Sequence, residues 1–227
     1  MKALVLSSGG LDSTTALALA VKEYGHENVI SLSVSYGQKH TKELKAAEEV
    51  AKYYDVEHMF VDLTAIFKYS NCSLLTGSTE EIPHESYAEQ IKKTDGQTPV
   101  STYVPFRNGL FLSVAASIAL SKDCQYIYYG AHADDAAGSA YPDCSEVFNN
   151  AINTAIFEGS GKQLTVKSPF VGKNKADIVA IGHKLNAPYH LTWSCYEGGQ
   201  KPCGECGTCI DRANAFKANN LKDPALL

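Results

Sequence analysis

Short apolar runs alternate with longer amphipathic stretches along most of this chain. Residues 3–6, 29–34 and 58–61 are apolar runs of strand length, and residues 11–20 and 42–54 have the residue spacing of helices. Because parallel strands need a crossover connection that is usually a helix, this β-α-β-α order predicts a parallel sheet flanked by helices.

The second half of the chain continues the pattern. Residues 109–120 are apolar nearly all round and predict a buried helix, which a strand over residues 126–130 follows. A helix over 146–157, a strand over 164–167 and a helix over 175–185 complete the predicted core. The fold class that we expect is therefore α/β, with a Rossmann-like parallel sheet.

Two stretches lack a regular pattern. Residues 63–105 are too long for a passive connection in a compact domain, and residues 131–144 follow the predicted fourth strand. The breakers in the first stretch are Gly77, Pro83, Gly96 and Pro99. We expect the first stretch to be a lid or a substrate loop, and the second to be a functional loop.

Length, composition and charge restrict the class of protein. With 227 residues, of which 44% are hydrophobic, the chain can form a nucleotide-binding domain over 1–190 with a segment, 191–227, packed on it as one unit. A formal charge of −5 argues against direct nucleic-acid binding and favours small-molecule substrates. Because no stretch is apolar enough to span a bilayer and no leader pattern is visible, we expect a cytoplasmic protein without a membrane partner.

The first apolar run leads directly into the motif Ser7-Ser8-Gly9-Gly10-Leu11-Asp12-Ser13 and then a helix. Glycines let an oxyanion approach the backbone, hydroxyls donate hydrogen bonds, and the N–H groups of a helix N-terminus attract phosphate. The motif lacks the lysine of a Walker A loop and the spacing of a dinucleotide fingerprint, and a glycine turn after a strand is by itself common. The nucleotide-binding residues that we expect are Ser7, Ser8, Gly9, Gly10, Leu11, Asp12, Ser13, Thr14, Thr15, Ala16 and Leu17.

Four cysteines near the C-terminus have the spacing C-x7-C-x2-C-x2-C: Cys195, Cys203, Cys206 and Cys209. Four thiolates make a closed tetrahedral zinc site that leaves no position for water, so the predicted zinc is structural. An iron–sulfur cluster uses similar ligands and stays open as the alternative, whereas disulfides are less suited to a reducing compartment. The remaining cysteines lack metal-type partners in the sequence: Cys72, Cys124 and Cys144.

Several side chains in the irregular stretches suit a binding site. Arg107 precedes the predicted buried helix and can bind a phosphate or a carboxylate with two hydrogen bonds, with a local ion pair as the alternative. Asp143 can accept from the paired N–H donors of a guanine-like base, although Pro-Asp is also a common turn pair. Tyr141 and Phe106 can stack on a base or serve as packing anchors.

Acidic and basic side chains also follow the predicted strands. Asp134 and Asp135 come after the fourth strand, where ligands gather in open α/β sheets, and they can help to hold Mg²⁺ or form a solvated loop. Lys39 and His40 follow the second strand. Three other histidines are expected to be structural or on the surface: His132, His183 and His190.

The motif SGGLDS resembles the PP-loop of the ATP pyrophosphatases, which cleave ATP between its α and β phosphates and adenylate a substrate oxygen. Together with VPFRN at 104–108, AYPDC at 140–144 and TWSCYEGGQKPCGECGTC at 192–209, it resembles the 7-cyano-7-deazaguanine synthase family over essentially the whole chain. One departure is GSAYPDCS at 138–145, where members of the family often have SGYPDCR.

The resemblance implies an adenine-nucleotide hydrolase-like fold and an ATP-dependent ligase of the queuosine precursor pathway, which converts 7-carboxy-7-deazaguanine and ammonia into the nitrile. It also implies ATP, Mg²⁺, one structural Zn²⁺ per chain and a homodimer, and it puts Lys39 and His40 near the nucleotide. On the matching positions it implies catalytic roles for Asp12, Ser13 and Arg107, substrate contacts from Tyr141, Asp143 and Arg107, and zinc binding by Cys195, Cys203, Cys206 and Cys209.

Other functions stay open on the sequence alone. Within the same superfamily, tRNA-modifying enzymes and amide-forming synthetases use similar loops, but the tRNA enzymes usually need a basic surface or an added RNA-binding domain. An enzyme that stops at the amide would have the same motifs. So would a nucleotide-binding regulator without turnover, in which the cysteine segment serves as an interaction finger.

Overall fold

A five-stranded parallel sheet forms the centre of the computed structural model, which describes residues 1–93, 98–137 and 140–226. Its strands lie in the order β3-β2-β1-β4-β5, and every neighbouring pair is parallel. The strands are β1 (Ala3–Leu6), β2 (Val29–Ser35), β3 (Glu57–Asp62), β4 (Tyr126–Tyr128) and β5 (Thr165–Lys167). This architecture confirms the predicted α/β class. The predicted breaker Gly96 and the departure at Gly138 and Ser139 lie outside the described residues.

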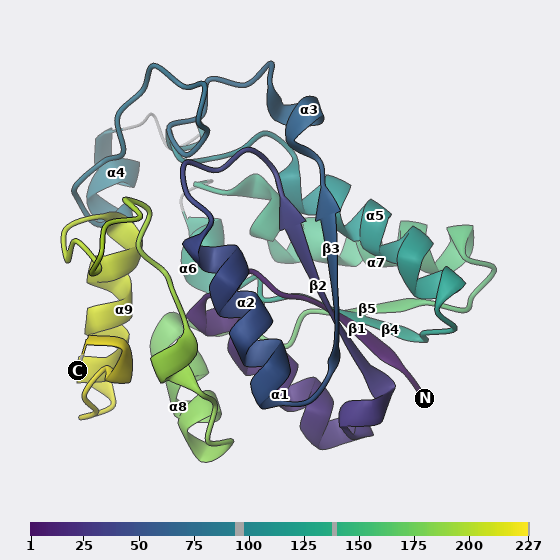
Figure 1. Cartoon of the computed structure of the whole chain (residues 1–227). Helices are drawn as coiled ribbons and strands as arrows, with labels where there is room; N and C mark the ends of the chain where they lie inside the picture. The colour runs from purple at the N-terminus through teal and green to yellow at the C-terminus, as the bar shows by residue number, and fades with distance from the viewer. Residues whose placement is uncertain (94–97, 138–139, 227) are drawn as a thin grey trace.

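Helices cover both faces of the sheet (Figure 1). The helices α1 (Leu11–Tyr24), α2 (Lys42–Tyr53) and α8 (Lys175–Lys184) lie on one face, and α5 (Arg107–Ser121) and α7 (Glu146–Gly159) lie on the other. The side chains of β1 alternate between the two cores, because successive residues of a strand point to opposite faces. Ala3 and Val5 pack in the first core, between the sheet and α1, α2 and α8. Leu4 packs in the second core, between the sheet and α5 and α7, and all three side chains are fully buried.

The strand order places the functional loops. The chain winds from β1 outward to β2 and β3, and then returns to add β4 and β5 on the other side of β1. In open α/β sheets, ligands bind outside the carboxyl ends of the strands at the point where this winding reverses. The loops that follow β1 and β4 therefore meet at the edge of the sheet where a ligand site is expected.

The prediction that residues 63–105 are irregular was wrong in two places. The stretch contains α3 (Thr64–Phe67) and α4 (Tyr87–Lys93). At the start of α4, the Ser86 hydroxyl accepts from the Glu89 N–H while the Glu89 carboxylate accepts from the Ser86 N–H, which is a capping box. Tyr87 and Gln90 are buried one turn apart, so packing stabilises this short helix. The loop at 131–144 likewise contains α6 (Ala133–Ala136) and a 3₁₀ turn, Pro142–Cys144.

A helix in the C-terminal segment was not predicted. Helix α9 (Gly207–Ala218) lies beside α8 in Figure 1, and its Phe216 packs into the first core. Arg212 on the same helix forms a buried ion pair with Asp223, with 2.6 Å between Nε and Oδ2. The described residues also include short 3₁₀ helices at His26–Asn28, Tyr189–Leu191 and Pro224–Leu226. No helix of the described residues has the length and apolar character needed to cross a bilayer.

Candidate functional site

A deep cavity opens at the carboxyl ends of the parallel strands. Its wall is formed by the loop after β1, the end of β2, the first turns of α2, α5 and α8, the loop after β4 and residues 193–196. The cavity has a volume of about 220 Å³ and is partly open to solvent, so a ligand can enter it from outside.

The loop after β1 presents the N-terminus of α1 to this cavity. The Ser8 N–H donates to the Ser13 hydroxyl over 3.2 Å, and the two serine hydroxyls lie 3.0 Å apart. Gly9 has φ = 78°, which favours glycine, and a Cβ there would collide with the backbone of α2 at Glu43. The loop therefore holds its serine hydroxyls beside the first N–H groups of α1, as a phosphate site requires.

The structure brings only part of the predicted nucleotide-binding stretch to the cavity. The lining residues from this stretch are Ser7, Ser8, Gly10, Leu11, Asp12 and Ser13. Gly9 and residues 14–17 are not among them. The Thr15 hydroxyl lies 2.7 Å from the hydroxyl of Tyr189, and Ala16 and Leu17 are fully buried in the core. Thr15, Ala16 and Leu17 lie beyond the first residues of α1, where the helix packs against the sheet and α8 and does not face the cavity.

A cluster of charges lies beside the loop. Asp12 Oδ2 is 3.4 Å from Lys175 Nζ at the start of α8 and 3.7 Å from His132 Nε2. His132 is 1% exposed, and its Nε2 is also 3.3 Å from Asp135 Oδ2. Burial opposes the charge of Lys175, but Asp12 and Asp135 outweigh it and raise the pKa of the ammonium group. Lys175 thus stays cationic next to the loop where phosphates would bind.

Only some members of this cluster were predicted from the sequence. Asp12 and Asp135 line the cavity as expected, whereas the Asp134 carboxylate accepts from the Lys175 N–H over 2.8 Å and faces the start of α8. Lys175 was predicted only as the start of a helix. His132, expected to be structural or on the surface, lies buried between two acids. The available signal for both was that they lie in or at the end of the loops that follow β4 and β5, at the carboxyl edge of the sheet.

Arg107 lines the cavity from the first turn of α5. Its guanidinium carbon lies 5.1 Å from the centre of the Tyr36 ring, and within the described part of the chain no carboxylate lies at ion-pair distance from it. The local ion pair that was the alternative role for Arg107 is therefore absent from the described residues. Glu43 lines the same cavity, and burial raises the pKa of its carboxyl to about 7 although Arg107 opposes the shift.

The three remaining candidates near Arg107 differ in position. Tyr141 lines the cavity, and its hydroxyl is hydrogen-bonded to that of Thr102. Asp143 does not line it: its Oδ2 accepts from the Asn108 N–H over 2.8 Å, which holds the start of α5. Phe106 is 57% exposed and packs against Phe148, so it is not placed to stack on a ligand in this cavity.

The basic pair after β2 is also outside the cavity. Lys39 Nζ donates to the Glu80 carbonyl, and His40 Nε2 lies 3.0 Å from the Cys195 carbonyl. Gln38, the residue before them, does line the cavity. His183 and His190 are exposed, in agreement with their expected surface position.

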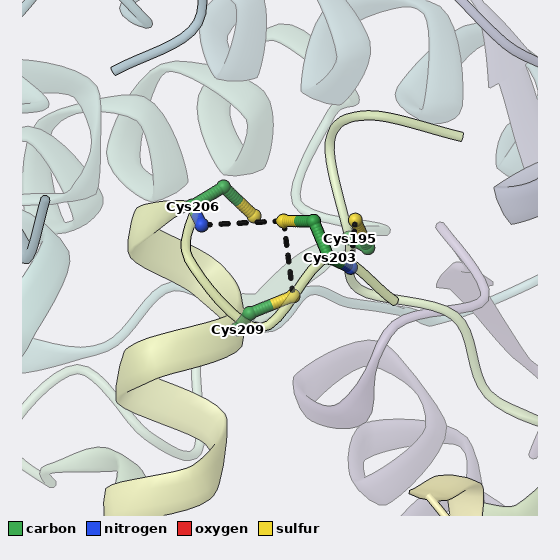
Figure 2. Close-up of side chains that lie close together, drawn as sticks. All are labelled: Cys195, Cys203, Cys206 and Cys209. Atoms are coloured by element: carbon green, nitrogen blue, oxygen red, sulfur yellow. Dashed lines mark hydrogen bonds between the residues drawn. The ribbon is translucent and has the colours of Figure 1, made fainter. Parts of the chain in front are cut away.

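The four predicted cysteines form one cluster at the start of α9. Figure 2 shows their side chains pointing toward one another, and their sulfurs all lie within 4.8 Å of one another. The Cys203 sulfur accepts from the Cys206 N–H over 3.3 Å, and the Cys195 sulfur accepts from the Cys203 N–H over 3.3 Å. Four sulfurs around one zinc ion lie roughly 3.8 Å apart, so this donor set fits a tetrahedral metal ion.

The cysteine cluster is tied to the phosphate loop by the residues that precede Cys195. The Trp193 N–H donates to the Gly9 carbonyl over 2.9 Å. The Ser194 carbonyl accepts from the Thr208 hydroxyl over 2.6 Å, and its side chain accepts from Arg212 over 3.1 Å. A metal ion in the cluster would thus hold a segment that braces the loop.

A phosphate loop at the reversal point of a parallel sheet, with an acid and a lysine beside it, defines an enzyme of the PP-loop class. A model of the family described as "Queuosine biosynthesis protein QueC" matches residues 2–220, and this chain belongs to that family. It is 44% identical to a 7-cyano-7-deazaguanine synthase from Archaeoglobus fulgidus, over all of this chain and 90% of that protein. It is 42% identical to another from Caldicellulosiruptor saccharolyticus, over 99% of this chain and 94% of that protein.

Among solved structures, a more distant likeness is the NH3-dependent NAD synthetase from Campylobacter jejuni. The identity is 15% and the TM-score is 0.49, over 96% of this chain and 75% of that one.

Proposed function

We propose that this protein is a 7-cyano-7-deazaguanine synthase, which uses ATP to convert 7-carboxy-7-deazaguanine and ammonia into the nitrile. The observation that carries the proposal is that the phosphate loop, Lys175 and Arg107 line one cavity at the carboxyl ends of the strands. The relatives that match nearly the whole chain have this name and support it.

The first step forms a bond between a substrate carboxylate oxygen and the α-phosphorus of ATP, and pyrophosphate leaves. A carboxylate is a poor acceptor for ammonia until its oxygen becomes a good leaving group, and AMP is one. In this protein the N–H groups of Leu11, Asp12 and Ser13 at the start of α1 would hold the leaving pyrophosphate, and Lys175 would neutralise charge on the phosphates. Arg107 is placed to bind the substrate carboxylate or a phosphate through its paired N–H groups.

Ammonia then displaces AMP from the activated carbonyl and leaves the amide. Conversion of the amide to the nitrile must remove its oxygen, and a second adenylation of that oxygen with release of pyrophosphate, followed by loss of AMP and of both N–H protons, achieves this. One nucleotide site would serve both activations. The protein's part in each is mainly to position the reactants and to neutralise phosphate charge.

The carboxylate of Asp12 fits a role in binding Mg²⁺. Its Oδ1 is buried and has no hydrogen-bond partner within the described residues, and Asp135 offers a second carboxylate at the same cavity. Mg²⁺ prefers oxygen ligands and usually binds one or two carboxylates together with substrate phosphates. When bound there, the ion would neutralise phosphate charge beside Lys175.

We propose Zn²⁺ as the ion of the cysteine cluster. All four donors are thiolates and would leave no open position for a substrate, so the ion's role would be structural. It would keep the segment at 193–196 against the phosphate loop through the hydrogen bond from Trp193 to Gly9.

The test of the proposed function is product analysis. Incubation of the protein with 7-carboxy-7-deazaguanine, ammonium, Mg²⁺ and ATP is expected to give a product lighter than the amide by one water, together with AMP and pyrophosphate. Mass spectrometry identifies the base product and phosphorus NMR identifies the nucleotide products. Accumulation of the amide alone under excess ATP would show an amide synthetase, and ATP binding without base-dependent turnover would show a regulator.

We also propose that the protein acts in the cytoplasm as a homodimer. Three buried cysteines outside the cluster are unpaired, as suits a reducing compartment: Cys72, Cys124 and Cys144. Between residues 108 and 121, helix α5 has no charged residue, and the neighbouring Val147 and Phe106 are 80% and 57% exposed. An uncharged face of this kind can meet a second copy of itself without repulsion between like charges.

Replacement of Val147 by glutamate tests the dimer. Light scattering is expected to give the mass of a dimer for the natural protein and that of a monomer for Val147→Glu, because the new carboxylate would face its copy across the interface. Glu158→Gln, at the other end of α7, is the control and should leave the mass unchanged. A natural protein with the mass of a monomer would contradict the proposal.

A further inference from the structure

Glu43 places a carboxylate at the cavity. Neither the sequence motifs nor the proposed reaction steps give this carboxylate a role. Glu43 lies in the first turn of α2, beside the phosphate loop, because its own backbone carbonyl packs against Gly9. Its side chain shares the cavity with Tyr36 and Arg107, and the same part of the wall includes the apolar residues Leu32, Val34 and Phe111.

The Glu43 carboxylate has no internal partner. Within the described ranges, no hydrogen bond or ion pair to its oxygens is present, although Arg107 exerts a longer-range attraction on it. Burial raises the pKa of the Glu43 carboxyl to about 7, whereas Arg107 lowers it. The side chain is half-buried at the cavity wall, so its oxygens can accept from a ligand in the cavity without a competing protein donor.

The geometry of a carboxylate selects the kind of ligand edge that it can bind. Its two oxygens match two parallel N–H donors, as in a guanidinium or the edge of a guanine-type ring with its ring N–H and 2-amino group. The edge of adenine places its amino donor beside a ring nitrogen that is an acceptor, and a carboxylate repels that lone pair. The carboxylate therefore suits the deazaguanine ring and not the adenine of ATP.

We propose that Glu43 is a specificity-determining residue, whose carboxylate binds the ring N–H and the 2-amino group of the 7-deazaguanine substrate. The inference rests on the proposed function, and it gives Glu43 the role that the sequence suggested for Asp143. Asp143 is already used by the backbone of α5, whereas Glu43 faces the cavity without a partner.

The test compares two substrates on two variants. The substrates are 7-carboxy-7-deazaguanine and its analogue without the 2-amino group, and the readout is kcat/KM for each. A well-placed bidentate pair discriminates by about 1–3 kcal/mol, so the natural protein should prefer the full substrate by roughly 5- to 150-fold. In Glu43→Gln this ratio is expected to fall toward one, because the carboxamide cannot accept both hydrogen bonds. The KM for ATP and for ammonium should stay unchanged.

Glu49→Gln, on the exposed side of the same helix, is the matched control and should keep the full preference. Thermal unfolding of both variants excludes a general loss of structure, and calorimetric binding of the two bases without ATP gives a readout that needs no turnover. If Glu43→Gln keeps the preference of the natural protein, or loses affinity for ATP alone, the inference is wrong. If the natural protein neither binds nor converts either base, the proposed function itself fails.

Discussion

Asp12→Asn is expected to lower kcat for pyrophosphate release by at least about 100-fold while the protein stays folded. The side chain keeps its size, but the negative charge beside Lys175 is lost, and a neutral amide attracts Mg²⁺ less than a carboxylate does. Because transition-state charge is stabilised by groups fixed around the phosphates, the loss should appear in kcat more than in the binding of the base. A coupled assay for pyrophosphate measures it.

The control for this variant is Asp55→Asn, an exposed acid far along the chain from the loop. It removes the same charge from the protein and should leave turnover unchanged. Equal melting temperatures of the two variants would show that the fold is intact. Turnover of Asp12→Asn at the natural rate would contradict the role assigned to the phosphate loop.

The second large effect is expected for Cys206→Ser. The variant should lose most of its bound zinc, and its free energy of unfolding should fall by about 3 kcal/mol or more, because a three-thiolate site binds zinc more weakly and zinc binding is coupled to folding. For a chain of this size that corresponds to roughly 6–12 °C in melting temperature. Metal analysis and thermal unfolding measure the two effects.

Zinc loss should also weaken ATP binding, because the cluster would no longer hold residues 193–196 against the phosphate loop. Trp193 donates to Gly9, and Thr208 and Arg212 hold Ser194. Cys124→Ala, a buried cysteine outside the cluster, is the control and should keep its zinc and its affinity for ATP. A Cys206→Ser protein with full zinc content and unchanged stability would show that the cluster does not hold zinc.

Much of the fold was predictable because its signals are local. The strand at 3–6 and the glycine turn after it are contiguous, so the phosphate loop could be located from seven consecutive residues. The cysteine spacing predicted one cluster, and the structure confirms that the four sulfurs meet. Turns of two residues between ligands restrict their geometry without help from the rest of the chain.

The helices that were missed depend on tertiary contacts. Helix α9 has a buried ion pair between Arg212 and Asp223, and α4 is a short helix with a buried Tyr87. Short helices are marginal on their own and are stabilised by packing, which periodicity along a single segment does not reveal. The capping pair Ser86 and Glu89 was the local signal available for α4.

The class of fold, the phosphate loop, the cysteine cluster and the family were predictable from the chain alone, because each depends on residues close together in the chain or on motifs in a set order. The set of side chains that share the cavity with Asp12 depends instead on how distant segments pack. Lys175 and His132 reach it because β4 returns to lie beside β1, and Glu43 reaches it because α2 packs on the glycine turn. The carboxylate of Asp143 accepts a hydrogen bond from the backbone of α5 and is not available to a ligand. Glu43 lines the cavity without a protein partner and can bind the substrate that we propose.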